Sequence, residues 1–125
     1  MHRALLPLAL IAAAAAPAAD RVPEATPTGP AESCIPIVGI RESLVRSDSV
    51  IDFVMRGSRV YRVTLPNGCP GLGFERRFSY ATSLSRLCQQ DVITVLSTAP
   101  MQRGASCGLA PFQPVALAKR ERRER

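Results

Sequence analysis

Cysteine is the residue type with the most reactive chemistry in this 125-residue chain. Its four cysteines, Cys34, Cys69, Cys88 and Cys107, lack the C-x-x-C spacing of redox-active pairs and of common zinc sites. A zinc site built from four widely spaced single cysteines would be unusual, so neither a metal nor a cofactor is expected. If the chain is exported, as its N-terminal residues indicate below, an even count of cysteines in so short a chain instead predicts two disulfides.

The other reactive side chains do not form a catalytic set. Serine or cysteine nucleophiles depend on an imidazole base, and the only histidine is His2, in a segment that is expected to be removed. Asp52, Glu75 and Asp91 are the carboxylates that a glycosidase-like pair would need. Simpler roles are available: Asp52 can pair with Arg62, Glu75 with the arginines next to it, and Asp91 can begin a strand. The sequence therefore predicts that this protein is not an enzyme.

One short cluster combines arginine with aromatic residues. Arg76 and Arg77 lie between Phe74 and Phe78, and Tyr80 follows. Such a cluster could hold an anionic sugar, a phosphate or a nucleic-acid single strand, which makes Arg76, Arg77 and Tyr80 the candidate surface-binding residues. The alternative is that the three aromatic rings cover the open end of a small core while the arginines point to water.

The N-terminal residues have the layout of a secretory signal peptide. A charged start, Met1-His2-Arg3, is followed by an apolar run over 4–16 and by small residues up to Ala19. The run is shorter than the roughly 20 residues that a membrane helix needs, and no later stretch is longer. We expect cleavage after Ala18 or Ala19, a periplasmic or secreted protein, and no transmembrane segment after cleavage.

The charge of the chain is concentrated at its C-terminus. The net charge is +6, from 16 basic and 10 acidic residues. Residues 119–125 (KRERRER) hold five positive and two negative charges. Because the rest of the expected mature chain is nearly balanced, this distribution argues against specific nucleic-acid binding.

Composition divides the chain into four parts. After the signal peptide at 1–19, residues 20–33 are predicted to be a disordered Pro-rich linker, and residues 116–125 a charged disordered tail. Between them, 34–115 is predicted to be a small β domain with irregular loops. Strands are expected at about 35–42, 49–55, 59–65 and 91–96, with a Pro-containing edge strand at 107–115. The fold class is mainly β: a small five-stranded antiparallel meander or partly open barrel, stabilised by disulfides.

The second and third strands should form a hairpin with a three-residue loop. Only an odd loop places the apolar residues of both strands on one face, and Gly57 can adopt the positive φ that such a loop needs. The predicted opposite pairs are Ile51–Val63, Phe53–Tyr61, Met55–Arg59 and, as a charge pair on the outer face, Asp52–Arg62.

A meander limits how the cysteines can pair. Cys34 and Cys69 would lie at opposite ends of parallel-running strands, roughly 20 Å apart, and Cys88 and Cys107 meet the same difficulty. Two connectivities remain open. The preferred one joins Cys69 to Cys88 and Cys34 to Cys107, and each bridge should stabilise the fold by roughly 3 to 4 kcal/mol.

Several segments resemble a known family. They are Cys34-Ile35-Pro36, the stretch from Arg59 to Cys88, DVITVL from Asp91 and GASCGLAPFQPV from Gly104. With their four cysteines and their C-P-G-L and C-G-L motifs, they resemble a family of small exported alphaproteobacterial proteins that have no assigned function. The resemblance covers most of 34–115 and implies export and disulfide bonds, but no catalytic or binding residue.

These observations predict a small exported binding or structural module. Its expected partner is an envelope protein or an anionic envelope component. The alternative is a periplasmic inhibitor of a hydrolase, which also needs only a rigid, disulfide-pinned loop. An inhibitor of a cationic lysozyme would be expected to be acidic, so the basic charge favours the first function.

Overall fold

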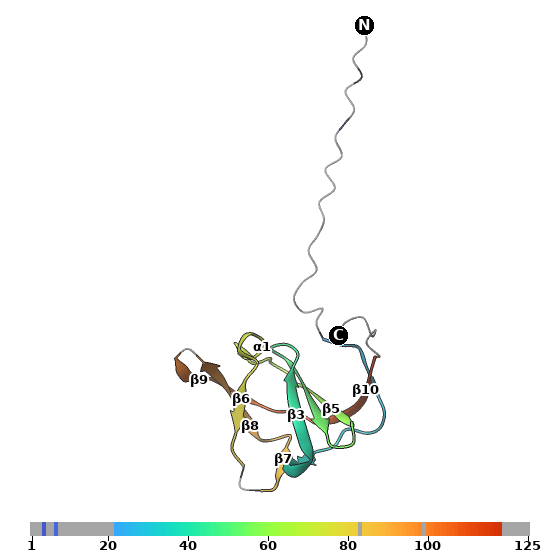
Figure 1. The fold of residues 1–125 in the computed structure, drawn as a ribbon, viewed down its shortest axis with the longest axis vertical. Coiled ribbons are helices and arrows are strands. Elements are labelled where there is room, and N and C mark those ends of the chain that lie inside the picture. Colours follow the sequence, from blue (N-terminus) through green and yellow to red (C-terminus); the bar gives the residue numbers. More distant parts are fainter. Residues whose placement is uncertain (1–3, 5–6, 8–21, 83, 99, 119–125) are drawn as a thin grey trace.

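The chain forms short antiparallel β-strands in a computed structural model, which describes Ala4, Pro7 and residues 22–82, 84–98 and 100–118 (Figure 1). The mainly β, disulfide-stabilised fold class is confirmed. Apart from Ala4 and Pro7, the predicted signal peptide lies outside the described residues, as does most of the charged tail. The strands are β1 (Ala25–Pro27), β2 (Cys34–Pro36), β3 (Ile40–Val45), β4 (Val50–Met55), β5 (Val60–Thr64), β6 (Phe78–Tyr80), β7 (Arg86–Cys88), β8 (Val92–Thr98), β9 (Met101–Gly108) and β10 (Gln113–Leu117).

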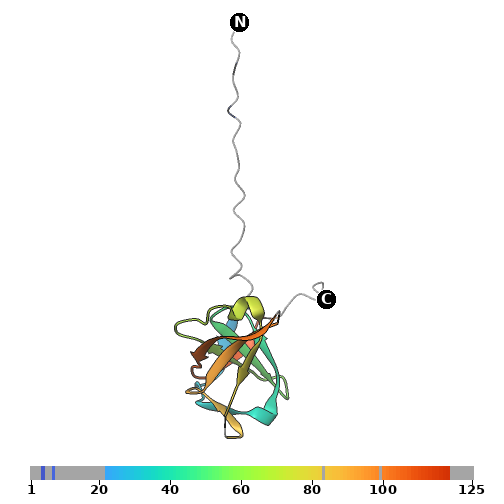
Figure 2. The same ribbon diagram turned by 90° about the vertical axis from the view of Figure 1, so that its left-hand side faces the viewer.

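The described strands make three antiparallel sheets around one interior. The largest has the order β1-β10-β5-β4-β3, the second pairs β2 with β7, and the third has the order β6-β8-β9. In Figure 2 the strands curve around a common core, as in a partly open barrel. A single meander is therefore wrong beyond β5. The irregular segment after β5 and the helical turn α1 (Leu72–Glu75) lead the chain away from that sheet, and β10 takes the place beside β5.

The β4–β5 hairpin has the predicted register. Met55 N–H donates to the carbonyl of Arg59 across 2.7 Å, which closes a loop of three residues. Gly57 has a φ of 88°, as predicted, and Ser58 also has a positive φ. The opposite pairs are Ile51–Val63, Asp52–Arg62 and Phe53–Tyr61. This register depends only on local features, the period of two and the loop length, and both are visible in the sequence.

The first predicted strand, 35–42, is two strands separated by a 3-10 turn at Ile37–Gly39. β2 ends at Pro36, and the 3-10 turn follows directly. Gly39 lies so close to the core that a β-carbon there would meet Met55 Cε at 3.1 Å. The turn lets β2 pair with β7 while β3 pairs with β4.

The predicted linker is ordered from residue 22 onward. Residues 25–27 form β1 along one edge of β10, and Glu32 forms a two-way backbone bridge with Phe112. Prolines are compatible with this position because β1 is an edge strand, where a missing N–H costs nothing on the outer side. β1 also covers backbone groups of β10 that would otherwise stay unpaired. The ordered domain thus begins before Cys34 and extends to Ala118, whose N–H donates to the carbonyl of Glu24.

Two other predicted segments differ from the structure. The segment between the predicted strands 91–96 and 107–115, for which no strand was predicted, belongs largely to β9, which pairs with β8 in a hairpin. The expected edge strand 107–115 is divided between β9 and β10, and β10 lies between β1 and β5. Pro114 is accommodated because it faces Thr28, just beyond the end of β1, and it still accepts that residue's N–H at 3.0 Å.

The core is one cluster that draws on all three sheets. Phe53 and Phe112 are fully buried, with ring centroids 5.7 Å apart in an edge-to-face arrangement. Phe112 comes from the irregular segment before β10, where the alternation of apolar residues is interrupted by prolines. The fully buried aliphatic side chains come from several different strands and from α1: Ile35, Ile51, Val63, Leu72, Leu87 and Ile93.

The disulfides join Cys34 to Cys88 and Cys69 to Cys107. The preferred pairing was therefore wrong, whereas the exclusion of Cys34–Cys69 and Cys88–Cys107 is confirmed. Cys34 opens β2 and lies directly opposite Cys88 in β7, so the bridges are those of the second connectivity that the sequence left open. The second bridge joins the irregular loop after β5 to β9, and so connects the five-stranded sheet to the three-stranded one.

Candidate functional site

The three candidate residues Arg76, Arg77 and Tyr80 lie around one hollow. Arg76 ends α1 in a left-handed conformation, with φ of 57°, and its N–H donates to the carbonyl of Leu72 at 2.8 Å. The carbonyl of Arg77 accepts the N–H of Leu96 at 3.0 Å, which brings the chain alongside β8 and begins β6. This sharp turn places both exposed arginines beside the aromatic residues of β6.

The hollow has a volume of about 250 Å³. It is smaller than the roughly 300 to 1,000 Å³ of sites that enclose a whole small-molecule ligand. It can therefore enclose only a small group, such as a carboxylate or phosphate. Its lining comes from β3, from the α1–β6 connection, from β6 and from β8: Ser43, Arg76, Arg77, Phe78, Tyr80 and Leu96.

The aromatic residues of the cluster have different roles. Phe78 packs against the core and meets Phe53 edge-to-face, with centroids 6.3 Å apart. Tyr80 is half-buried beside Phe78, at 6.5 Å between centroids. Phe74 is 87% exposed, so the expectation that it covers the core is wrong. Two of the three rings, Phe78 and Tyr80, therefore pack against the core and also line the hollow.

Neither arginine of the hollow has an acidic partner in the described part of the chain. The ion pairs found there join Arg46 and Arg62 to Asp52, and Arg59 to Glu32. Glu75, which was expected to pair with its neighbouring arginines, makes no such contact in this set. Two arginines that line one hollow without a carboxylate partner among the described residues are suited to an external anion, which can accept several charge-assisted hydrogen bonds.

Sequence reasoning missed Ser43 and Leu96. Ser43 lies in β3 and Leu96 in β8, both far along the chain from Arg76. No local pattern could place them here, because their contact depends on how the five-stranded and three-stranded sheets meet.

Asp52 is fully buried rather than at an exposed outer face. Arg62 donates to it at 2.8 and 3.0 Å, and Arg46 donates at 2.9 Å. Both arginine side chains are 14% exposed and close over the carboxylate. All three bonds come from cations within the fold, so this carboxylate stabilises the sheet and is not presented to a ligand. Asp91 also has a structural role, since it accepts the N–H of Cys88 at 2.7 Å before β8.

Arg59 is occupied by neighbours in a separate cluster. It donates a hydrogen bond to the Tyr61 hydroxyl and lies over that ring, 5.4 Å from the centroid. Burial and the nearby Glu32 carboxylate raise the pKa of Tyr61 above its ordinary value. This cluster ties the segment before β2 to β5, so Arg59 is not equivalent to the unpaired arginines of the hollow.

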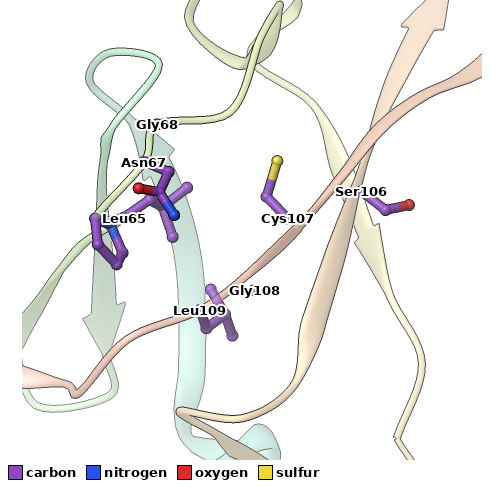
Figure 3. A pocket seen from close by; sticks show the side chains of 8 residues that line it. Leu65, Asn67, Gly68, Ser106, Cys107, Gly108 and Leu109 are labelled. Atoms are coloured by element: carbon purple, nitrogen blue, oxygen red, sulfur yellow. The ribbon is translucent and has the colours of Figure 1, made fainter.

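A second hollow, of about 330 Å³, lies beside the Cys69–Cys107 bridge (Figure 3). One wall is the segment after β5, and the other is the end of β9, where Cys107 lies. Its lining contains no charged side chain, and three of the eight lining residues are glycine or proline: Leu65, Pro66, Asn67, Gly68, Ser106, Cys107, Gly108 and Leu109. Unlike the arginine hollow, it offers no charged side chain that could select one class of ligand.

Comparison with known proteins adds no identity. The chain matches no protein-family model, no curated protein and no solved structure. Within the described residues, the helical segments are single turns, and none is long and apolar enough to cross a membrane. The function must therefore be argued from the geometry of the hollow.

Proposed function

We propose that this protein is a small exported binding module whose arginine hollow binds an anionic group of an envelope component or of another protein. The observation that carries the proposal is the placement of Arg76 and Arg77 beside Tyr80 around one hollow, without an acidic partner among the described residues. An exposed guanidinium pair next to an aromatic wall binds anions through bidentate, charge-assisted hydrogen bonds.

Export is supported by two independent features. The N-terminal 19 residues have the three-part layout of a signal peptide. Both described disulfides are of the kind that persists in oxidising compartments and is rare in the cytosol.

Export should be accompanied by removal of the N-terminal segment. In a Gram-negative bacterium that expresses the chain, mass spectrometry of the exported protein should find a new N-terminus at Ala19 or Asp20. Leu8→Arg, which places a charge in the apolar run, should leave an uncleaved cytoplasmic form, whereas Thr26→Arg should not. Recovery of intact Met1 from the exported fraction of the unchanged chain would contradict cleavage.

Small anions should bind at the hollow. Titration of ¹⁵N-labelled protein with acetate and with inorganic phosphate, at constant ionic strength, should shift the resonances of Arg76, Arg77 and Tyr80. Arg76→Gln and Arg77→Gln should each weaken binding by about tenfold or more, because a hydrogen bond to a charged group contributes about 1.5 to 3 kcal/mol.

The matched control is Arg103→Gln in β9. Arg103 is also exposed and also outside the ion pairs of the described residues, but it does not line the hollow. If Arg103→Gln weakens binding as much as Arg76→Gln, the attraction reflects net charge and not a site.

One observation favours inhibition of a hydrolase as a second function. The β8–β9 hairpin projects from the body of the molecule in Figure 1, and Met101 near its tip is 74% exposed. Such a projecting hairpin, held at its base by the Cys69–Cys107 bridge, is a suitable shape for entering a cleft. Inhibition of an envelope hydrolase that is lost on Met101→Glu, but kept in Arg76→Gln, would support this function over the first.

A further inference from the structure

The arginine hollow lies between two open sheet edges. β3 is the last strand of the five-stranded sheet and β6 is the last strand of the three-stranded sheet, and the described residues place no strand on the far side of either. Ser43 of β3 and both Phe78 and Tyr80 of β6 line the hollow.

The hydrogen-bond alternation shows which backbone groups of β6 point outward. In an antiparallel pair, residues that exchange hydrogen bonds alternate with residues that do not. Leu96 N–H donates to the carbonyl of Arg77, so Arg77 belongs to the bonded set, as does Ser79 opposite Thr94. The N–H and carbonyl groups of Phe78 and Tyr80 therefore point away from β8.

The same reasoning applies to β3. Arg46 N–H donates to the carbonyl of Val50 at 2.9 Å, so Arg46 and Leu44 belong to the set bonded to β4. The N–H and carbonyl groups of Ser43 and Val45 consequently point away from β4. Two rows of backbone donors and acceptors that have no strand partner within the described part of the chain thus border the hollow.

We propose that the hollow is a docking site for a short, extended, acidic peptide segment of another protein. The segment adds as a strand to the edge of β6, and one of its carboxylates binds Arg76 and Arg77. This inference rests on the proposed function, because it specifies the anion that the hollow takes. Strand addition supplies the main-chain hydrogen bonds, and the arginine pair supplies the preference for an acidic side chain or terminus.

The backbone groups favour a peptide over a sugar or a lipid headgroup. Alternating N–H and carbonyl groups in an open edge complement another peptide backbone, and an edge of this kind is a template for strand pairing. The small volume of the hollow, about 250 Å³, suits one acidic group with the rest of the segment outside it.

The length and shape of the edges restrict pairing to a short segment. β6 has only three residues, and β3 carries a bulge between Ile40 and Glu42. Such features limit uncontrolled edge-to-edge association. The tail of this chain is a poor occupant, because residues 119–125 carry five positive charges against two negative ones.

The test uses the oxidised protein and a synthetic six-residue peptide of alternating valine and threonine that ends in two glutamates. Two further peptides carry N-methyl groups on alternate amides. The first is methylated on the amides that point to one edge of the strand, and the second on the amides that point to the other edge. Each keeps the charge of the parent peptide but loses the main-chain donors along one edge. At least one methylated peptide should bind about tenfold more weakly than the parent. Equal binding by all three would overturn strand addition.

Amide hydrogen exchange locates the peptide. On binding, the exchange of Phe78 and Tyr80 amides should slow, whereas Ser79, already bonded to β8, should change little and serves as the internal control. Arg77→Gln should weaken peptide binding about tenfold or more, and Arg103→Gln should not. Unchanged exchange at Phe78 and Tyr80 under saturating peptide would overturn the assignment.

The outcomes separate this inference from the proposed function. If acetate and phosphate bind at the arginines but the peptide does not slow the β6 amides, the anion site stands and the peptide assignment fails. If vesicles containing phosphatidylglycerol bind through Arg76 and Arg77 while the peptide does not, the anion is a headgroup and the peptide assignment also fails. If none of these probes binds, both proposals fail.

Discussion

Peptide mapping of the unreduced protein should recover Cys34 joined to Cys88 and Cys69 joined to Cys107. Reduction of both bridges should then lower the free energy of unfolding enough to unfold the domain. On the loop-entropy model, bridges across separations of 54 and 38 residues contribute about 4 kcal/mol each. Small domains are stable by only about 5 to 15 kcal/mol in total.

The two bridges should differ in importance. Cys34–Cys88 joins β2 to β7, which already pair through backbone hydrogen bonds. Cys69–Cys107 joins the five-stranded and three-stranded sheets, and Cys69 is almost fully buried in the core. We expect the double substitution Cys69→Ala with Cys107→Ala to be the more destabilising of the two double substitutions in urea unfolding. Recovery of a peptide that joins Cys69 to Cys88 would contradict the β2–β7 pairing itself.

Substitution of Asp52 by asparagine should lower the free energy of unfolding by about 3 to 5 kcal/mol, because it leaves two largely buried arginines without their counter-charge. Asparagine keeps the shape of the side chain, so the loss reports the charge and not a cavity. Urea unfolding monitored by near-UV circular dichroism measures the change.

Two further variants test this interpretation. Asp48→Asn is the matched control, because the Asp48 carboxylate is exposed and accepts one N–H, from Gly73 at 2.7 Å. It should cost only about 1 kcal/mol. The triple variant Asp52→Leu, Arg46→Leu and Arg62→Leu should be much more stable than Asp52→Asn, since a buried ion network can be replaced by apolar side chains. A loss below about 1 kcal/mol in Asp52→Asn would show that the network does not stabilise the fold.

The arginine hollow shows where prediction of the site succeeded and where it stopped. Arg76, Arg77 and Tyr80 are close in sequence, so one short stretch of composition was enough to select them as candidates. The hollow itself also needs Ser43, from the edge strand β3 of the five-stranded sheet, and Leu96, from the central strand β8 of the three-stranded sheet. Ser43 of β3 and Tyr80 of β6 line the same hollow only because of how the two sheets are placed, and no residue pattern within either strand encodes that arrangement.

The sequence by itself determined the mainly β class, the presence of two disulfides and the register of the β4–β5 hairpin, because each follows from local periodicity, a turn glycine or cysteine number. Only the tertiary structure decided the disulfide partners, the ordering of the Pro-rich segment and the burial of Asp52. Cys34 meets Cys88, 54 residues away, because the 3-10 turn after Pro36 separates β2 from β3 and lets β2 pair with β7. Asp52 is buried because Arg46, from the adjacent turn, closes over it together with Arg62. These contacts are long-range or three-body, and their energies depend on packing that forms only when the sheets assemble.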